Sequence, residues 1–173
     1  MAGNLAGNRA GNPAGNSPAA ISAARGEGRR FGVVASRYHE ELVDRLLAGA
    51  TGCLREHGVR ADAIEVARVP GAWEIPLALH WLAAGGRFDG LVALGLVLRG
   101  ETPHFEYVSA ECSRGVAAVA ERHGLPVGFG VLTCDTLAQA EARAGGETGN
   151  KGREAALAAL EMADLRHRLA EAG

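Results

Sequence analysis

Hydrophobic residues follow two different spacings along this chain. Short runs that are apolar or that alternate apolar with polar residues occur at 31–36, 64–69, 88–98 and 126–133, and each has the length of a β-strand. Elsewhere apolar residues recur every three or four positions, which places them on one face of an α-helix. This second spacing predicts helices over residues 40–57, 73–84, 102–124, 136–144 and 150–169.

The regular alternation of strands and helices predicts an α/β fold, a three-layer α/β/α sandwich around a parallel sheet. The first, third and fourth strands are almost uniformly apolar, which is typical of strands covered by helices on both faces. Ligands of such folds bind beyond the carboxyl ends of the strands. We therefore expect functional residues in the segments that directly follow each strand.

The first residues have a different composition from the rest. Near-repeats of Ala-Gly-Asn run from Ala2 to Asn16 and offer almost nothing to bury, so residues 1–28 are expected to form a disordered tail. A single domain is expected over residues 29–173. The tail lacks the charged start and apolar run of a signal peptide. A second interpretation is a tail that lies on a partner subunit.

Composition excludes several classes of protein. The chain is 47% hydrophobic, which suffices for a sizeable core, and its net charge of -2 without basic runs argues against a nucleic-acid partner. No apolar stretch is long enough for a membrane span. Cys53, Cys112 and Cys134 are far apart and fit neither a zinc site nor a disulfide framework. They indicate buried, reduced thiols in a cytoplasmic protein that needs no metal.

The segments after the first two strands contain two candidate ligand-binding side chains. Tyr38 follows the first strand, where its ring could stack on a flat heterocycle or simply pack on the rim of the fold. Glu74 falls in the first turn of the next predicted helix. It could accept hydrogen bonds from ligand hydroxyls or amines, or only complement the helix dipole.

The segment after the third strand is the most informative. Thr102 is predicted to cap the following helix, Pro103 suits the first helical position, and Gly100 allows a close turn. Free N–H groups and the helix dipole there favour an anion. His104 follows at once, and an imidazole beside a bound phosphate suits proton transfer near neutral pH.

Three later residues are open to two interpretations. Phe129 lies within the fourth strand, which by itself predicts a core position. Arg143 presents a planar fork that suits phosphate, and Lys151 lies at the start of the last helix, where a cation gains nothing from the dipole.

Four long segments, in chain order, resemble the lumazine synthase family. They read VPGAWEIPLA, FDGLVALGLVLRGETPHFEYV, PVGFGVLTCDT and ARAGGETGNKGREAALAALEMA, and the match runs from about Phe31 to the end of the last helix. The resemblance implies a flavodoxin-like fold with a four-stranded parallel sheet. It implies a transferase of riboflavin biosynthesis that condenses 5-amino-6-(D-ribitylamino)uracil with 3,4-dihydroxy-2-butanone 4-phosphate, without a cofactor.

The resemblance also implies an assembly. Members of this family form homopentamers with active sites between adjacent subunits, and some stack into decamers or icosahedral shells of sixty subunits. Riboflavin synthase is a candidate partner of such an assembly.

Residue roles carried over from the resemblance are expectations. Tyr38 would stack on the pyrimidine ring, and Phe129 of the neighbouring subunit would close that pocket. His104 would donate and accept protons. The remaining substrate-binding residues would be Ala72, Trp73 and Glu74 for the ribityl chain and ring, Leu96, Val97 and Leu98 for the ring, and Glu101, Thr102, Arg143 and Lys151 for the phosphate and its surroundings.

Three positions depart from the family's usual residues. Tyr38 replaces a common Phe or Trp, His39 a common Asn, and Arg153 a common Trp. The first two lie at the expected ring site, so a paralogue that binds lumazine or flavin without turnover remains an alternative. A protein whose shell is its main role is the other.

Overall fold

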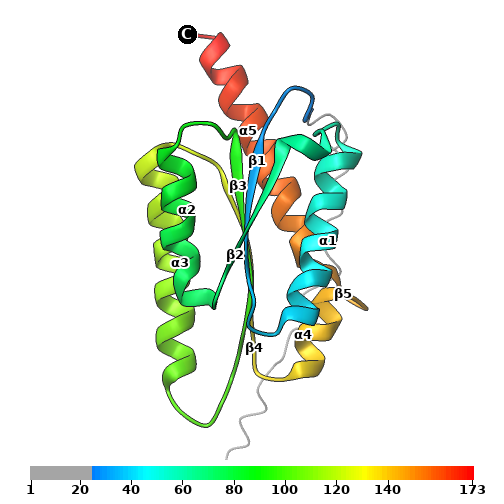
Figure 1. Ribbon diagram of the computed structural model, residues 1–173, viewed down its shortest axis with the longest axis vertical. Coiled ribbons are helices and arrows are strands. Elements are labelled where there is room, and N and C mark those ends of the chain that lie inside the picture. Colours follow the sequence, from blue (N-terminus) through cyan, green and yellow to red (C-terminus); the bar gives the residue numbers. More distant parts are fainter. Residues whose placement is uncertain (1–24) are drawn as a thin grey trace, which may run out of the picture.

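The computed structural model describes residues 25–173, which fold around one parallel sheet between two layers of helices (Figure 1). The sheet has the order β2-β1-β3-β4, and every neighbouring pair is parallel. Its strands are β1 (Phe31–Ser36), β2 (Ile64–Val69), β3 (Gly90–Leu98) and β4 (Val127–Cys134). The predicted three-layer α/β/α sandwich and the four-stranded parallel sheet are confirmed.

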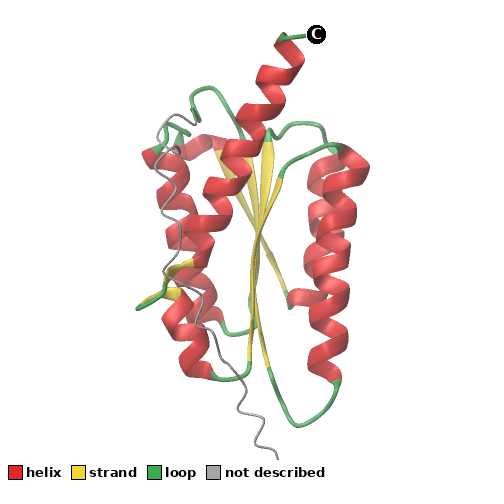
Figure 2. Ribbon diagram, turned by 180° about the vertical axis from the view of Figure 1, so that it is seen from behind, coloured by secondary structure: helices red, strands yellow, loops and turns green. Residues whose placement is uncertain are grey.

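Helices cover both faces of the sheet. They are α1 (Glu40–Glu56), α2 (Ile75–Ala84), α3 (His104–His123), α4 (Leu137–Arg143) and α5 (Lys151–Glu171). Two 3-10 turns, η1 (Ala61–Ala63) and η2 (Ala72–Glu74), and a small hairpin, β5 (Ala144–Gly146) with β6 (Gly149–Asn150), complete the fold. Helices α1, α4 and α5 lie on one face, and α2 and α3 on the other (Figure 2).

Two hydrophobic clusters explain why the central strands are apolar throughout. Val33 and Ala35 of β1 belong to the cluster under α1 and α5, whereas Val34 between them belongs to the cluster under α2 and α3. Alternate side chains thus reach opposite helix layers, and the interior strand buries all of them.

The fourth strand is covered on both faces, as predicted, but not along its whole length. Leu132 belongs to the cluster under α1 and α5, and Val131 to the cluster under α2 and α3. Because β4 is an edge strand, Phe129 and Thr133 on it are nevertheless exposed. The prediction that Phe129 is a core residue is therefore wrong for the single chain, in which 44% of its surface is accessible. An apolar run indicates burial but does not say what buries it.

Two helix starts also differ from their predictions. The helix expected from residue 73 begins as the 3-10 turn η2, and α2 starts at Ile75 with Pro76 in its first turn, where proline is tolerated. The helix expected from Thr102 starts at His104, with Pro103 at the cap position and no side-chain cap. The hairpin of β5 and β6 was not predicted.

The expectation of a disordered tail falls mostly on residues 1–24, which lie outside the described residues. Packing begins before the expected domain boundary, because the N–H of Gly26 donates to the carbonyl of His57 at the end of α1, at 2.8 Å. Within residues 25–173, no helix is both long and apolar enough to cross a membrane.

Candidate active site

The strands end toward the lower end of Figure 1, and the segments that follow them form a cavity of about 380 Å³. Its walls come from the segments after β1 and β2, from the end of β3 and from the start of α3. The lining residues are Tyr38, Gly71, Ala72, Trp73, Leu96, Val97, Leu98, Gly100, Thr102, His104, Phe105 and Val108. Its volume lies within the range of ordinary small-molecule sites.

Parallel pairing brings the first two segments together. Ser36 is aligned with Val69, so β1 and β2 end side by side. Beyond that point the N–H of Arg37 donates to the carbonyl of Val69 at 2.8 Å, and the N–H of Tyr38 to that of Pro70 at 3.2 Å. These bonds fix the backbone of Tyr38 beside the loop that leads to Trp73, and both aromatic side chains remain exposed.

Glu74 stabilises the same loop. Its carboxylate accepts from the N–H of Gly71 at 2.9 Å and so closes η2. Glu74 is not among the residues that line the cavity, and its second carboxylate oxygen is not used in this bond. Ala72, which it helps to hold, is buried and faces the cavity.

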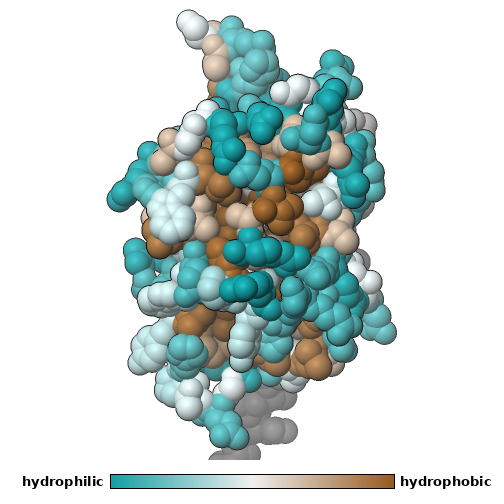
Figure 3. All heavy atoms as spheres, viewed as in Figure 1, coloured by the Kyte–Doolittle hydropathy of each residue, from teal (hydrophilic) through white to brown (hydrophobic). Residues whose placement is uncertain are grey.

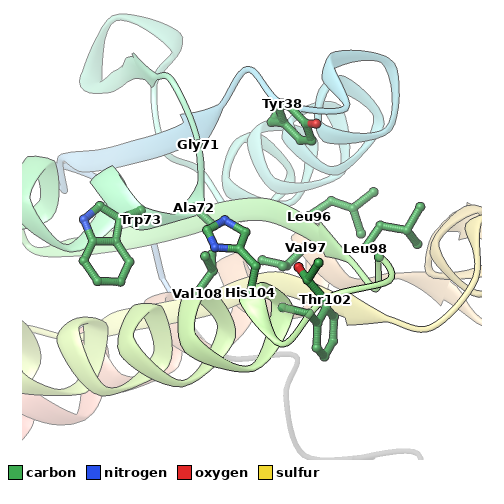
Figure 4. A pocket seen from close by; sticks show the side chains of 12 residues that line it. Tyr38, Gly71, Ala72, Trp73, Leu96, Val97, Leu98, Thr102, His104 and Val108 are labelled. Atoms are coloured by element: carbon green, nitrogen blue, oxygen red, sulfur yellow. The ribbon is translucent and has the colours of Figure 1, made fainter.

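The start of α3 presents unused N–H groups. No side chain caps this helix, and the first N–H groups of any helix lack intrahelical acceptors. Thr102, predicted as the cap, instead lines the cavity. Figure 4 shows the imidazole of His104 pointing from the start of α3 toward the loop of Gly71 and Ala72. The site thus combines an anion-favouring helix start with an accessible imidazole.

Arg99 lies between the end of β3 and this helix start. Its Nε donates to Asp135 at 2.6 Å, and one terminal nitrogen donates to Glu106 at 2.5 Å. The guanidinium carbon lies 4.1 Å from the centre of the Phe105 ring. The hydrogen bonds to Glu106 first, and then to Asp135, raise the pKa of Arg99 above its usual value.

His39 carries the one unusual backbone conformation near the site. Its φ of 58° and ψ of 47° lie in the left-handed region, which Asn, Asp and His tolerate better than other side chains with a Cβ. The substitution of His for a common Asn therefore keeps the turn into α1. The rings of His39 and Tyr38 meet edge to face, with centroids 4.9 Å apart.

Eight of the thirteen predicted site residues line the cavity, and five do not. Outside it lie Glu74, Glu101, Phe129, Arg143 and Lys151. Phe129 is exposed on β4, and Arg143 ends α4 with a hydrogen bond to its own helix, to the carbonyl of Gln139 at 3.0 Å. Lys151 pairs with Glu154 at 2.6 Å.

Four lining residues were not among the predicted site residues, namely Gly71, Gly100, Phe105 and Val108. The sequence indicated only a close turn at Gly100 and a helix over Phe105 and Val108. Helical spacing contained the missing signal for Val108, since a residue four positions after His104 lies one turn further on the same face.

Metal ligands and reactive thiols do not gather at this site. Among residues 25–173, no group of three or more His, Cys, Asp or Glu residues is arranged to hold a metal ion. All three cysteines are free and buried, as predicted. Burial raises the pKa of the Cys112 thiol to about 11 and raises the pKa values of Cys53 and Cys134.

The fold and the cavity define a three-layer α/β/α protein with a small-molecule site at the carboxyl edge of its sheet. A family model described as 6,7-dimethyl-8-ribityllumazine synthase matches residues 28–167. The chain belongs to this family.

Curated relatives carry the same name and match over most of their length. The chain is 52% identical to 6,7-dimethyl-8-ribityllumazine synthase of Halorhodospira halophila over 140 residues, which is 81% of this chain and 90% of the relative. It is 52% identical to that of Aquifex aeolicus over 139 residues, covering 80% and 90%. Identity to that of Desulfovibrio desulfuricans is 51% over 135 residues, covering 78% and 86%.

Proposed function

We infer that this chain is a transferase of riboflavin biosynthesis that condenses 5-amino-6-(D-ribitylamino)uracil with 3,4-dihydroxy-2-butanone 4-phosphate to 6,7-dimethyl-8-ribityllumazine. Membership of the family and the relatives named lumazine synthase support this reaction. The structural observation that supports this reaction is that an exposed aromatic side chain, a helix start suited to phosphate and an imidazole all border one cavity. These are the groups that the two substrates require.

The flat pyrimidine belongs on the side of the cavity with the aromatic residues. We assign Tyr38 to stacking on the ring, with Leu96, Val97 and Leu98 providing backbone groups at the end of β3. Ala72 and Trp73 are assigned to the ribityl chain and ring, and the free oxygen of Glu74 to a ligand hydroxyl. Six of these seven residues lie in the cavity lining, which supports the assignment.

The phosphate belongs at the start of α3. We assign it to the N–H groups around Glu101 and to the hydroxyl of Thr102, because fixed donors can stabilise the charge that develops as phosphate leaves. Arg143 of a neighbouring subunit is assigned to the same phosphate, with Lys151 adding positive charge. The position of Arg143 outside the cavity of its own chain agrees with that arrangement.

The chemistry needs proton transfer at two stages. The 5-amino group attacks the ketone and loses water to form an imine, phosphate then leaves, and ring closure by the ribitylamino nitrogen releases a second water. We assign His104 to these proton transfers. Holding the two substrates together supplies a further part of the acceleration, so activity does not depend on His104 alone.

We propose further that the active unit is a ring of subunits, in line with the homopentamers of this family. Large hydrophobic side chains are exposed on the single chain, among them Trp81 on α2 and Phe129 on β4. Figure 3 shows hydrophobic atoms interrupting the polar surface in the middle of one face. Stacking into larger shells and association with riboflavin synthase stay predictions.

The first test follows the absorbance and fluorescence of the lumazine after mixing both substrates with the protein. We expect formation well above the uncatalysed background, and a decrease of about 100-fold in His104→Ala, at the lower end of the effect of a general acid–base group, because holding the substrates together also contributes. His167→Ala is the matched control, because His167 is exposed on α5 and pairs only with Glu171. Background-level formation by the wild type would refute the reaction. If flavin or lumazine still bound tightly, the protein would be a binding paralogue instead.

A further inference from the structure

The loop between β3 and α3 has few contacts of its own. Within residues 25–173, the N–H groups of residues 100–102 donate to no other backbone group, and all three residues are exposed. Gly100 and Thr102 nevertheless line the cavity, and His104 follows them. A loop that must present N–H groups to a ligand needs something else to fix its course.

Arg99, the residue that opens this loop, contacts the segments on both sides. Its N–H donates to the carbonyl of Cys134 at 2.9 Å, and its Nε donates to the next residue, Asp135, at 2.6 Å. Its terminal nitrogen reaches across the loop to Glu106 in the first turn of α3, at 2.5 Å. One side chain therefore connects the end of β4 with the start of α3.

The guanidinium of Arg99 also lies over the ring of Phe105, with its central carbon 4.1 Å from the centre of the ring. Phe105 is buried and lines the cavity. We call these four residues, Arg99, Phe105, Glu106 and Asp135, the Arg99 cluster. Exposed ion pairs usually contribute little, but a planar fork fixed by two carboxylates and a ring has few other orientations.

We propose that Arg99 is a positioning residue for the phosphate-bearing substrate, because it fixes the loop whose Gly100 and Thr102, together with the following His104, line the cavity. The inference rests on the proposed function, in which this loop binds the phosphate of the butanone. Arg99 acts through Glu106, Asp135 and Phe105 and does not itself line the cavity.

The negative charges in the Arg99 cluster distinguish a positioning role from a purely electrostatic effect. Glu106 and Asp135 place two negative charges close to a site for a phosphate, and by charge alone they would weaken its binding. Neutralising one of them should then strengthen binding. If their role is to hold Arg99, the same change should weaken it.

The experiment measures inorganic phosphate binding to the full chain by calorimetry, and the KM values of both substrates. We expect Arg99→Met to raise the Kd for phosphate and the KM for the butanone phosphate by roughly 5- to 20-fold. The KM for ribitylaminouracil should change less than about twofold. Arg114→Met is the matched control, since Arg114 pairs with Glu111 in an exposed pair further along α3, and it should leave all three values unchanged.

If Arg99→Met does not fold, two further variants test the same role of Arg99. Glu106→Gln should raise the Kd for phosphate by about two- to fivefold, although it removes a negative charge. Arg99→Lys, which keeps the charge but cannot reach both carboxylates in one plane, should lie between the wild type and Arg99→Met. Unchanged or tighter phosphate binding by Glu106→Gln, or wild-type behaviour of Arg99→Lys, would overturn the proposal.

Other outcomes are also decisive. If both KM values rise together with a loss of thermal stability, Arg99 is only a structural residue. A wild-type chain that binds no phosphate would also overturn the inference. Turnover by the wild type is measured separately, so a failure of the proposed function shows as missing lumazine, whereas the phosphate titrations judge Arg99 without any turnover.

Discussion

Nothing in the described part of the chain requires a glycine at position 100. A Cβ built there meets no atom within 4 Å, and its φ is not positive, yet the residue lines the cavity. We expect Gly100→Ala to change the free energy of unfolding by less than about 0.5 kcal/mol. It should nevertheless raise the KM for the butanone phosphate, because only a ligand close to the backbone would meet the new methyl group.

Urea denaturation and steady-state kinetics check this prediction together. Gly52→Ala serves as the control, since Gly52 also has open space around it but lies within α1, away from the cavity. Unchanged kinetics in Gly100→Ala would show that the phosphate does not approach this part of the loop.

The cysteines allow a prediction about pH. Burial raises the pKa of Cys112 to about 11 and raises those of Cys53 and Cys134, so all three should resist alkylation in the folded protein at pH 8 and react in urea. The ordinary pKa of a cysteine thiol is 9.0. Because the folded-state pKa values lie above this value, burial of the protonated thiols contributes its full stabilisation below pH 9 and progressively less at higher pH. For Cys112 the loss continues until the pH reaches about 11.

Mass spectrometry after iodoacetamide treatment, with and without urea, reads out the labelling. Urea midpoints at pH 8 and pH 10 test the linkage. Rapid labelling of Cys112 in the native protein would contradict its burial.

At the scale of elements, the crossing of α1 and α5 depends on a glycine. A Cβ at Gly152 would overlap the carbonyl oxygen of Leu46 on α1, and backbone atoms cannot rotate away. We expect Gly152→Ala to destabilise the fold by about 3 kcal/mol, because the two helices must separate. Gly52→Ala, on an open face of α1, should stabilise it by about 0.5–1 kcal/mol through helix propensity.

Chemical denaturation of the two variants beside the wild type checks both signs. Equal effects would mean that the helices can shift at little cost. Asn150 shares this junction, since its side chain donates to the carbonyl of Arg45 at 2.8 Å and accepts from the N–H of Arg153 at 3.1 Å. Part of the Asn-Lys-Gly sequence is therefore explained by packing.

The helices and strands differ in how well the sequence predicts them. The bounds of β1 and β2 were predicted to the residue, because turn formers or polar residues flank a clear apolar or alternating pattern. The start of α3 was misplaced because Thr102 and Pro103 fit a standard cap, and nothing local shows that the threonine faces a cavity instead. Periodicity places residues on a face, but the contacts of Arg99 with Asp135 depend on two strands that are distant in sequence.

At the scale of the whole molecule, one chain does not bring all the predicted site residues together. Phe129 and Arg143 were expected to come from a neighbour, and both lie outside the cavity of their own chain. Phe129 is also an exposed aromatic on an edge strand, a position that usually has a partner. Sequence patterns alone could not predict this, since they assigned Phe129 to the core.

Mixing two variants of strongly reduced activity tests a shared site directly. If each site takes His104 from one subunit and Arg143 from the next, neither His104→Ala nor Arg143→Ala contains an intact site. Rings reassembled from an equal mixture should contain intact sites at about one interface in four, since each half is correct with a chance of about one half. We expect about a quarter of the wild-type activity after the subunits are unfolded and refolded together, and no gain when folded variants are merely combined. Activity that stays at the average of the two variants would show that each chain completes its own site, and Arg143 would then need another role.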